Sequence, residues 1–389
     1  MKTFIKIFIP FIIILITTIF LIAYFFWLGY PKHKINILVL DKTVPTYDRI
    51  EHKSLFWVLN NARITKRNGD SYSYKEDYYG FFPLKPDWSR KYEIKRILLE
   101  QIDSLTDLYD AAYYADTYGV YYKEWLRGFH SEDDNALIEG GLNQNDYLFI
   151  KKMSEKKKLI IAEYNTLLPP TSELIKFKTQ ELFGLTSTGW YGKYFKSLDT
   201  SGNKDLPSWI PEKYKYQSNG KWLFNGPGIV IVNSNNNIIV VLDAKHCNKD
   251  KYPIIETSEN FRDKYHLPEH INYHNWFEIV SASDTFDVIS NYSLPVNESG
   301  DSLLNAYSIP AKFPAVLSYT KSSNNIYYFA GNFANNPIMQ FYSCMANSRR
   351  LISFFADNHK DFFLRYYFPL VETIFVNFSE NNKKKGEHI

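Results

Sequence analysis

The chain has 389 residues and nearly balances its charges, with 45 Lys and Arg against 42 Asp and Glu, so its formal net charge at pH 7 is +3. This balance provides no broad basic surface, and nucleic acid is not an expected partner. Aromatic residues make up 17% of the chain; such residues fill hydrophobic cores first and also line carbohydrate sites. The two cysteines, Cys247 and Cys344, lie far apart in sequence and do not indicate a redox compartment.

The first predicted element is an apolar run from Ile7 to Leu28. About 22 residues in a helix span roughly 33 Å, which is enough to cross the hydrocarbon core of a bilayer. The run ends in bulky aromatic residues rather than in the small residues of a signal-peptidase site, so an uncleaved membrane anchor is predicted over residues 1–34. Trp27 and Tyr30 are expected at the membrane interface.

The orientation of this anchor depends on the lysines at its two ends, which are nearly equal in number. The very short leader favours an N-terminus inside the cell. The protein is therefore predicted to be a single-pass cell-membrane protein with an extracytoplasmic soluble domain. The alternative is a cytoplasmic domain that is tethered to the inner face of the membrane.

Four short apolar segments, each ending in a polar or glycine turn, then predict strands over residues 35–40, 108–115, 136–139 and 159–162. The segments between and after them have helical spacing or helix-capping residues, which predict helices over residues 50–61, 90–102 and 143–157. Strands that alternate with helices indicate an α/β fold with a parallel sheet and helices on both faces. Residues 35–199 are assigned to this domain.

Polar and glycine residues stand at the ends of these predicted strands. Because ligands of parallel sheets bind at the carboxyl ends of the strands, six of these residues are expected to converge on one edge of the sheet. They are Asp41, Asp116, Gly140, Gly141, Glu163 and Asn165.

The pattern changes from about residue 200. A clear hairpin is predicted over residues 228–242, and further strands are predicted over residues 276–280, 313–319 and 326–330. Residues 200–325 are therefore assigned to a β-rich insertion or lobe. Residues 326–378 are expected to complete the α/β domain with a last strand and two helices, near 339–356 and 361–378, and residues 379–389 to form a disordered tail.

The Gly140-Gly141 turn, the helix after it and the strand that ends at Glu163 resemble the succession found in class I glutamine amidotransferase-like domains, over about residues 35–200. Residues 327–333 are similar to a strand of the related trehalose-utilisation-like and β-galactosidase-associated domains. The resemblance implies a flavodoxin-like sheet with a nucleophile at the turn after the fourth strand. Glu163 stands approximately where a cysteine is expected, and the sequence contains no Gly-x-Cys-x-Gly turn. Amidotransferase activity is therefore not expected, because glutamine hydrolysis through a thioester needs an activated thiolate.

A metal site is considered because His266, His270 and His274 recur at four-residue intervals. On a continuous helix, these three side chains would share a face and could bind zinc. Pro268 interrupts the segment, so a loop with exposed imidazoles is the preferred interpretation. No metal and no cofactor are expected.

Two functional hypotheses follow. The first is a membrane-tethered module that binds a cell-envelope glycan or a partner in polysaccharide synthesis or export, and the second is a glycoside hydrolase that pairs Glu163 with Asp116 or Asp41. Six residues are the candidates for ligand contact: Tyr118, Gly140, Gly141, Asn165, Trp190 and Lys193. For Trp190, the alternative is a β-bulge that packs the indole into the core.

Overall fold

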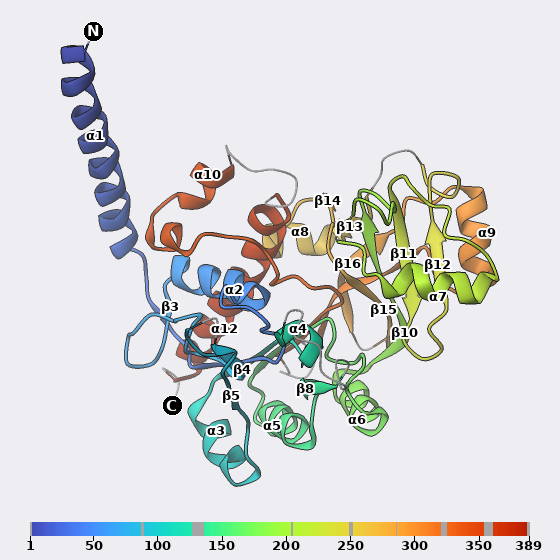
Figure 1. Ribbon diagram of the computed structural model, residues 1–389. Coiled ribbons are helices and arrows are strands. Elements are labelled where there is room, and N and C mark those ends of the chain that lie inside the picture. The colour runs from blue at the N-terminus through green and yellow to red at the C-terminus, as the bar shows by residue number, and fades with distance from the viewer. Residues whose placement is uncertain are drawn as a thin grey trace.

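The computed structural model describes residues 2–86, 89–126, 136–203, 205–248, 252–284, 286–319, 325–353 and 361–386. Within these residues, the fold is mixed α/β, with one ten-stranded sheet, one four-stranded sheet and two small strand pairs. A long N-terminal helix stands away from the body of the molecule (Figure 1).

This helix is α1, Lys2–Leu28. Its part from Pro10 to Leu28 is the only helix among the described residues that is long and apolar enough to cross a membrane, although a signal sequence would pass the same test. Trp27, for which the sequence predicts a place at the membrane interface, lies in the last turn of this helix. It is buried against the domain, where its Nε1 donates to the carbonyl of Asn61 at 3.1 Å and its ring lies 5.1 Å from the guanidinium of Arg63.

Five parallel strands form the centre of the large sheet. In spatial order they are β4 (Tyr79–Pro83), β2 (Ile37–Asp41), β6 (Ala111–Asp116), β9 (Leu159–Glu163) and β18 (Asn325–Phe329). Every residue of β2, β6 and β9 is buried, as expected for parallel strands that are covered on both faces. Antiparallel strands extend the sheet at both ends: β5 (Tyr92–Lys95) beside β4, and β17 (Lys312–Tyr319), β16 (Asp287–Ser293), β13 (Ile254–Thr257) and β14 (His270–Asn272) beyond β18.

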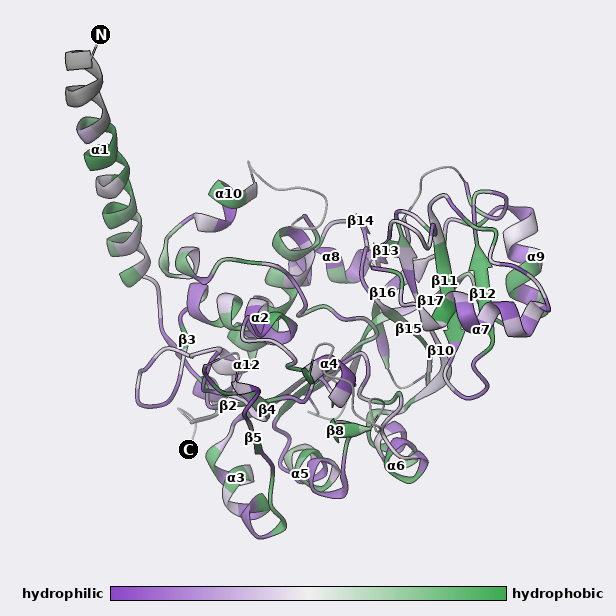
Figure 2. Ribbon diagram, viewed as in Figure 1, coloured by the Kyte–Doolittle hydropathy of each residue, from purple (hydrophilic) through white to green (hydrophobic). Residues whose placement is uncertain are grey.

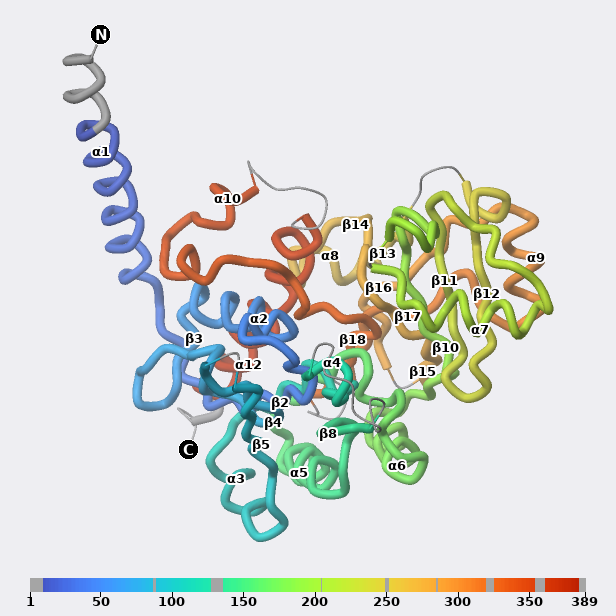
Figure 3. Tube along the Cα trace, in the orientation of Figure 1, coloured from blue at the N-terminus to red at the C-terminus, as the bar shows by residue number. Residues whose placement is uncertain are grey.

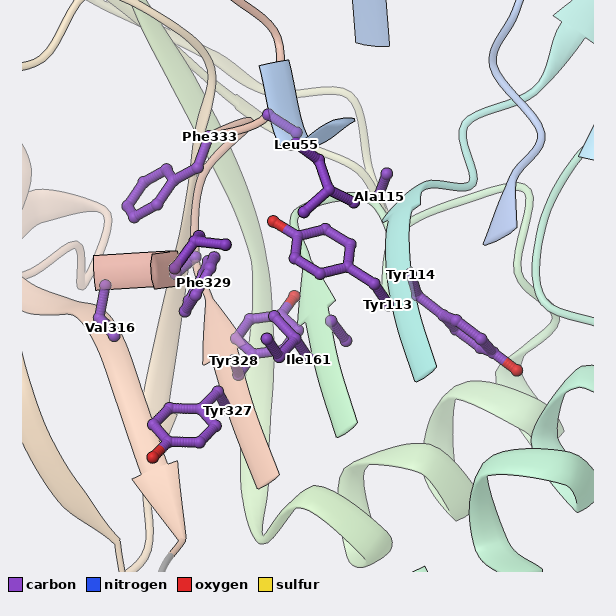
Figure 4. Close-up of a cluster of buried hydrophobic side chains, with 14 of the residues drawn as sticks. Leu55, Tyr113, Tyr114, Ala115, Ile161, Val316, Tyr327, Tyr328, Phe329 and Phe333 are labelled. Carbon is purple, nitrogen blue, oxygen red and sulfur yellow. The ribbon is translucent and has the colours of Figure 1, made fainter. Parts of the chain in front are cut away.

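Helices cover both faces of this sheet (Figure 1). Tyr113 and Tyr114 of β6 show the two sides, because they point in opposite directions (Figure 4). The hydroxyl of Tyr113 lies 2.9 Å from that of Tyr367, on the face covered by α2 (Ile50–Asn61), the π-helix η5 (Phe363–Tyr367) and α12 (Phe368–Gly386). The hydroxyl of Tyr114 donates to the carbonyl of Asp146 at 2.9 Å, on the face covered by α3 (Ile102–Leu108), α5 (Gln144–Glu155) and α6 (Glu173–Phe183).

The four-stranded sheet lies beside the C-terminal strands of the large one (Figure 3). Its order is β12 (Ile239–Leu242), β11 (Gly228–Asn233), β10 (Leu185–Phe195) and β15 (Phe277–Ala282), all antiparallel. Two helices, α7 (Trp209–Ser218) and α9 (Glu298–Ala306), accompany it. The predicted hairpin is therefore confirmed, but this sheet already begins at Leu185, before residue 200.

Three expectations for single elements are corrected. Residues 90–102 are not one helix: β5 pairs with β4, the 3₁₀ turn η2 (Leu99–Gln101) follows, and α3 begins only at Ile102. The predicted third strand, β8 (Leu137–Glu139), pairs with β7 (Val120–Tyr121) in a separate two-stranded sheet. Helix α12 continues to Gly386, past residue 378, and the last residues of the expected tail, 387–389, lie outside the described residues.

Shorter elements complete the fold. They are β1 (His33–Lys34), β3 (Ile64–Thr65), α4 (Tyr122–Leu126), α8 (Glu259–Tyr265), η4 (Gln340–Cys344) and α10 (Ser348–Ser353). The last two replace most of the helix that was expected over 339–356, of which residues 354–356 are not described.

Candidate functional site

The three predicted carboxylates do meet at the carboxyl edge of the central strands. Asp41 pairs with Asp116 across the β2–β6 ladder, and Glu163 is the last residue of β9, the next strand. All three side chains are buried, with 0% of Asp41, 3% of Asp116 and 0% of Glu163 exposed. The edge is therefore closed at these residues.

Asp41 forms a pair with His52 of α2, and one Asp41 oxygen lies 2.5 Å from the imidazole Nδ1. The imidazole Nε2 donates to the carbonyl of Tyr74 at 2.8 Å, and burial lowers the pKa of His52 to about 3. A neutral ring that donates from Nε2 can only accept at Nδ1, so the proton between the two groups belongs to Asp41. Burial, and then the charge of Asp116, hold the pKa of Asp41 well above its usual range, which agrees with this assignment.

Asp116 is held by three donors of the chain itself. One of its oxygens accepts from the hydroxyl of Thr43 at 2.8 Å, from the amide of Tyr118 at 2.8 Å and from the side-chain amide of Asn165 at 3.1 Å. Burial raises the pKa of Asp116 to about 6, and these hydrogen bonds oppose that rise. Thus Tyr118 and Asn165, which were predicted to contact a ligand, contact Asp116.

Glu163 joins the centre of the sheet to the segment after β18. Its Oε2 accepts from the backbone amides of Phe333 and Ala334 at 2.8 and 3.0 Å, and its Oε1 accepts from the hydroxyl of Tyr113. Burial raises the pKa of Glu163 to about 8, against the opposing effect of these three donors. Glu163 therefore positions the backbone at residues 333 and 334.

The glycine turn lies against the protein's own backbone. A Cβ atom at Gly140 would lie 2.7 Å from the carbonyl oxygen of Tyr118, and one at Gly141, whose φ is +68°, would lie 2.8 Å from the backbone of Pro170. These glycines allow close chain packing rather than close approach of a ligand. After β9, the residue with a left-handed backbone is Asn165, with φ +71°, and its amide side chain offers no nucleophile.

Trp190 and Lys193 of β10 have different surroundings. Trp190 is buried in the hydrophobic core and lies edge-on to Tyr307, beside the register shift between Ser187 and Tyr191, so the alternative core interpretation is confirmed for it. Lys193 lines a cavity, with its Nζ 5.4 Å from the ring of Phe195. Burial lowers the pKa of Lys193, while Asp205 acts in the opposite direction.

This cavity has a volume of about 760 Å³, within the range of small-molecule sites. Three segments that are distant in sequence form most of its lining: the end of β10 with the loop after it (residues 193–197, 202, 203 and 205), residues 273–275 after β14, and residues 332 and 335–337 after β18. Ile50 and Phe362 complete the lining. It therefore lies where the carboxyl end of β18 meets the four-stranded sheet. Amide and aromatic side chains are prominent in its lining: Asn203, Asn275, Asn332, Asn335, Asn336, Tyr194, Phe195, Tyr273 and Phe362.

Hydrogen bonds fix the cavity wall formed by residues 332–337. The side-chain amide of Asn275 donates to the carbonyls of Asn332 and Asn335 at 3.0 and 3.4 Å, and that of Asn336 donates to the hydroxyl of Ser54 at 3.2 Å. Asn332 is 7% exposed, and its Oδ1 has no hydrogen-bond partner among the described residues.

Among the residues that the structure describes, no group of three His, Cys, Asp or Glu side chains is placed to hold a metal ion. The three histidines considered above lie on different elements. His266 ends α8, His270 begins β14, and His274 lines the cavity. Burial, together with Asp243, raises the pKa of Cys247 to about 11, which disfavours a thiolate.

No protein-family profile matches the chain, and no curated protein matches it. Among solved structures, a glutamine amidotransferase from Thermotoga maritima is 8% identical, with 90% of this chain and 99% of that chain covered and a TM-score of 0.37. A protein named ThuA-like from Bacteroides uniformis is 8% identical, with coverage of 90% and 94% and a TM-score of 0.38. The carbohydrate deacetylase Agd3 is 8% identical, with coverage of 85% and 32% and a TM-score of 0.31. These neighbours carry no conclusion about the activity of this chain.

Sequence reasoning found Lys193 but missed most of the cavity. The asparagines at 332, 335 and 336 follow a predicted strand directly, so the rule that was applied to Asp41 and Glu163 could also have marked them. The approach of residues 193–205 and 273–275 to this strand end left no signal in the sequence.

Proposed function

We propose that this protein is a membrane-anchored binding protein whose cavity holds an uncharged polyhydroxy ligand, most simply a segment of a cell-envelope glycan that is being synthesised or exported. One contrast carries the proposal. The open cavity is lined mainly by amides and aromatic rings, whereas Glu163, Asp116 and Asp41 are buried and hydrogen-bonded to groups of the chain itself.

The chemistry of the cavity fits a sugar. Amide side chains both donate and accept, as hydroxyl groups do, and aromatic rings pack against the apolar faces of a pyranose. The side chain of Asn332 lines the cavity, and Lys193 supplies a donor next to Phe195. A ligand held through these groups needs no charge of its own.

For the scaffold, we propose a flavodoxin-like core with the four-stranded sheet as an added lobe. The parallel strands β4-β2-β6-β9-β18 are, in chain order, the second, first, third, fourth and fifth strands, which is the flavodoxin-like order. The lobe lies between β9 and β18 in sequence. Its loops supply one wall of the cavity. In this proposal the lobe is therefore part of the binding site.

The geometry supports binding over the two enzymatic alternatives. A glycosidase pair must face its substrate, but none of the three carboxylates lines the cavity. Glutamine hydrolysis needs a reactive thiolate, and the turn directly after β9, residues 164–172, contains no cysteine. Purified protein is therefore expected to release no ammonia from glutamine; release that persists in a Cys247→Ala, Cys344→Ala double variant would contradict this reading.

The binding proposal is tested with Asn332→Ala in the full-length protein in detergent, by titration against envelope oligosaccharides. Because Asn332 lines the cavity and its Oδ1 has no partner within the described chain, the substitution should leave folding intact and weaken binding about tenfold, the effect of one hydrogen bond. Asn305→Ala, on the exposed face of α9, is the matched control and should bind as the wild type does. Equal affinities for both variants would refute the cavity as the site.

The anchor is tested by fractionation. Full-length protein is expected in the membrane fraction, extractable by detergent but not by high salt, whereas a chain that begins at Lys34 should be soluble. Protease added to intact cells should digest the external domain. Full-length protein that stays in solution without detergent would refute the anchor, and a domain that is digested only after lysis would reverse the orientation.

A further inference from the structure

The segment of residues 339–353, formed by η4 and α10, exposes large apolar side chains although it belongs to the globular domain. Met339 is 70% exposed, Phe341 is 65% exposed and Leu351 is 44% exposed. Single exposed apolar residues are ordinary, but three in one short segment indicate a surface that contacts something apolar.

This segment lies beside the membrane-spanning part of α1 (Figure 1). The ring of Phe20 packs edge-on against Phe341, with 5.9 Å between the ring centres, and lies 6.5 Å from Tyr342. The amide of Ala346 donates to the carbonyl of Ala23 at 3.0 Å. Figure 2 shows that α1 is still largely apolar at its C-terminal end. The segment is thus attached to α1 well before the apolar run ends at Leu28.

The length of α1 determines the depth of the segment. From Phe20 to Leu28 the helix advances about 12 Å. If the 339–353 segment stayed in water, only residues 7–20 of α1 would remain for the hydrocarbon core, about 21 Å against the roughly 30 Å that is needed. If the bilayer covers the apolar run to Leu28, Phe341 reaches the depth of the acyl chains. Phe25 and Phe26, both exposed on α1, lie between Phe20 and the end of the apolar run at Leu28.

We propose that the 339–353 segment is a second membrane-contacting element, which lies in the boundary between headgroups and acyl chains of the leaflet nearest the domain. The proposal depends on the anchor proposed above, because α1 sets the depth. Short helices with exposed apolar side chains bind membranes in this way, and the exposed Arg350 can extend its charged end toward the headgroups. Two attachments would hold the domain in one orientation against the bilayer.

The test places an environment-sensitive fluorophore on a single cysteine at Phe341→Cys in full-length protein, with Cys247→Ala and Cys344→Ala. The labelled protein is reconstituted into phosphatidylcholine vesicles with and without spin-labelled acyl chains. Leu174→Cys, 62% exposed on α6 at a distance from α1, is the matched control. We expect a blue-shifted emission and quenching by spin-labelled lipid at position 341, with neither effect at position 174.

Co-flotation of the protein with the vesicles separates the two proposals. Co-flotation with equal iodide quenching at both positions and no lipid quenching would overturn the membrane contact and leave the anchor intact. A probe at 341 that is shielded from both iodide and lipid would assign the surface to a protein partner or a second copy, and would also overturn the inference. Failure to co-float would refute the anchor, and this inference with it.

Discussion

Replacement of Glu163 by alanine is expected to lower the free energy of unfolding by about 3 kcal/mol or more, because it leaves buried donors without an acceptor and opens a cavity. The donors are the amides of Phe333 and Ala334 and the hydroxyl of Tyr113. Since residues 333 and 334 lie within the wall that carries Asn332 and Asn335, the variant should also bind ligand more weakly. Chemical denaturation and ligand titration of the same preparation measure both effects.

Glu163→Gln should behave differently. Glutamine has the shape of the protonated acid, its oxygen can still accept from the two amides, and its NH₂ group can donate to the hydroxyl of Tyr113. Near pH 4.5, where the wild-type carboxyl is protonated in both states, the variant is therefore expected to be close to the wild type in stability, and at neutral pH it should bind ligand as the wild type does. Glu155→Gln, at the exposed end of α5, is the control for an ordinary surface change and should stay within about 0.5 kcal/mol.

The stabilities of the wild type and Glu163→Gln should diverge as the pH rises. Burial raises the pKa of Glu163 from 4.5 to about 8 in the folded state. Between these values the unfolded chain releases the proton while the folded chain keeps it, so the free energy of unfolding of the wild type falls with increasing pH, by a total on the order of 5 kcal/mol above pH 8. Glu163→Gln lacks this loss and should be the more stable protein at pH 9. An unchanged difference between pH 5 and pH 9 would show that Glu163 is ionised in the folded protein.

The central strands could be predicted because strands that are buried on both faces consist almost entirely of apolar residues. Residues 159–163 are apolar until the final carboxylate, as a strand covered on both faces must be. Tyr92–Lys95 shows where this reasoning fails. The apolar residues over 90–102 fit helical spacing. In the structure, however, Phe81 of β4 pairs with Ile94, and its ring stacks on Tyr92 with 4.9 Å between the ring centres, so this stretch forms a strand because of its tertiary contacts.

The site could be predicted only in part, for a related reason. The strand-end rule placed Asp41, Asp116 and Glu163 on one edge correctly. It could not show that their oxygens accept from Thr43, Tyr113 and the backbone at 333–334, because those donors come from other elements. Contacts between distant segments decide which part of this edge is filled by the chain and which part stays open. The same rule therefore identified the edge and missed the cavity at the carboxyl end of β18.

Lys42→Met is expected to lower the free energy of unfolding by about 3–5 kcal/mol, the usual cost of removing one partner from a buried ion pair. Lys42 is 2% exposed at the end of β2. Its Nζ lies 2.7 Å from Asp146 and 3.2 Å from Glu139, and it donates to the carbonyl of Gly141 at 2.8 Å. One cation thereby ties β2 to α5, to β8 and to the glycine turn.

A double-mutant cycle distinguishes loss of the Lys42–Asp146 ion pair from simple loss of packing. In Lys42→Met, Glu139 keeps its ion pair with Arg96 at 2.6 Å, so Asp146 is the carboxylate that loses its cation. Asp146→Asn removes that charge while keeping an oxygen that can accept from the amide of Asn143 at the start of α5. Combined with Lys42→Met, it should restore part of the lost stability, because fewer buried charges are left unpaired. Lys151→Met, half exposed on α5, should change little. If the two substitutions at 42 and 146 were simply additive, the ion pair would not be coupled in stability, and the loss in Lys42→Met would be one of packing.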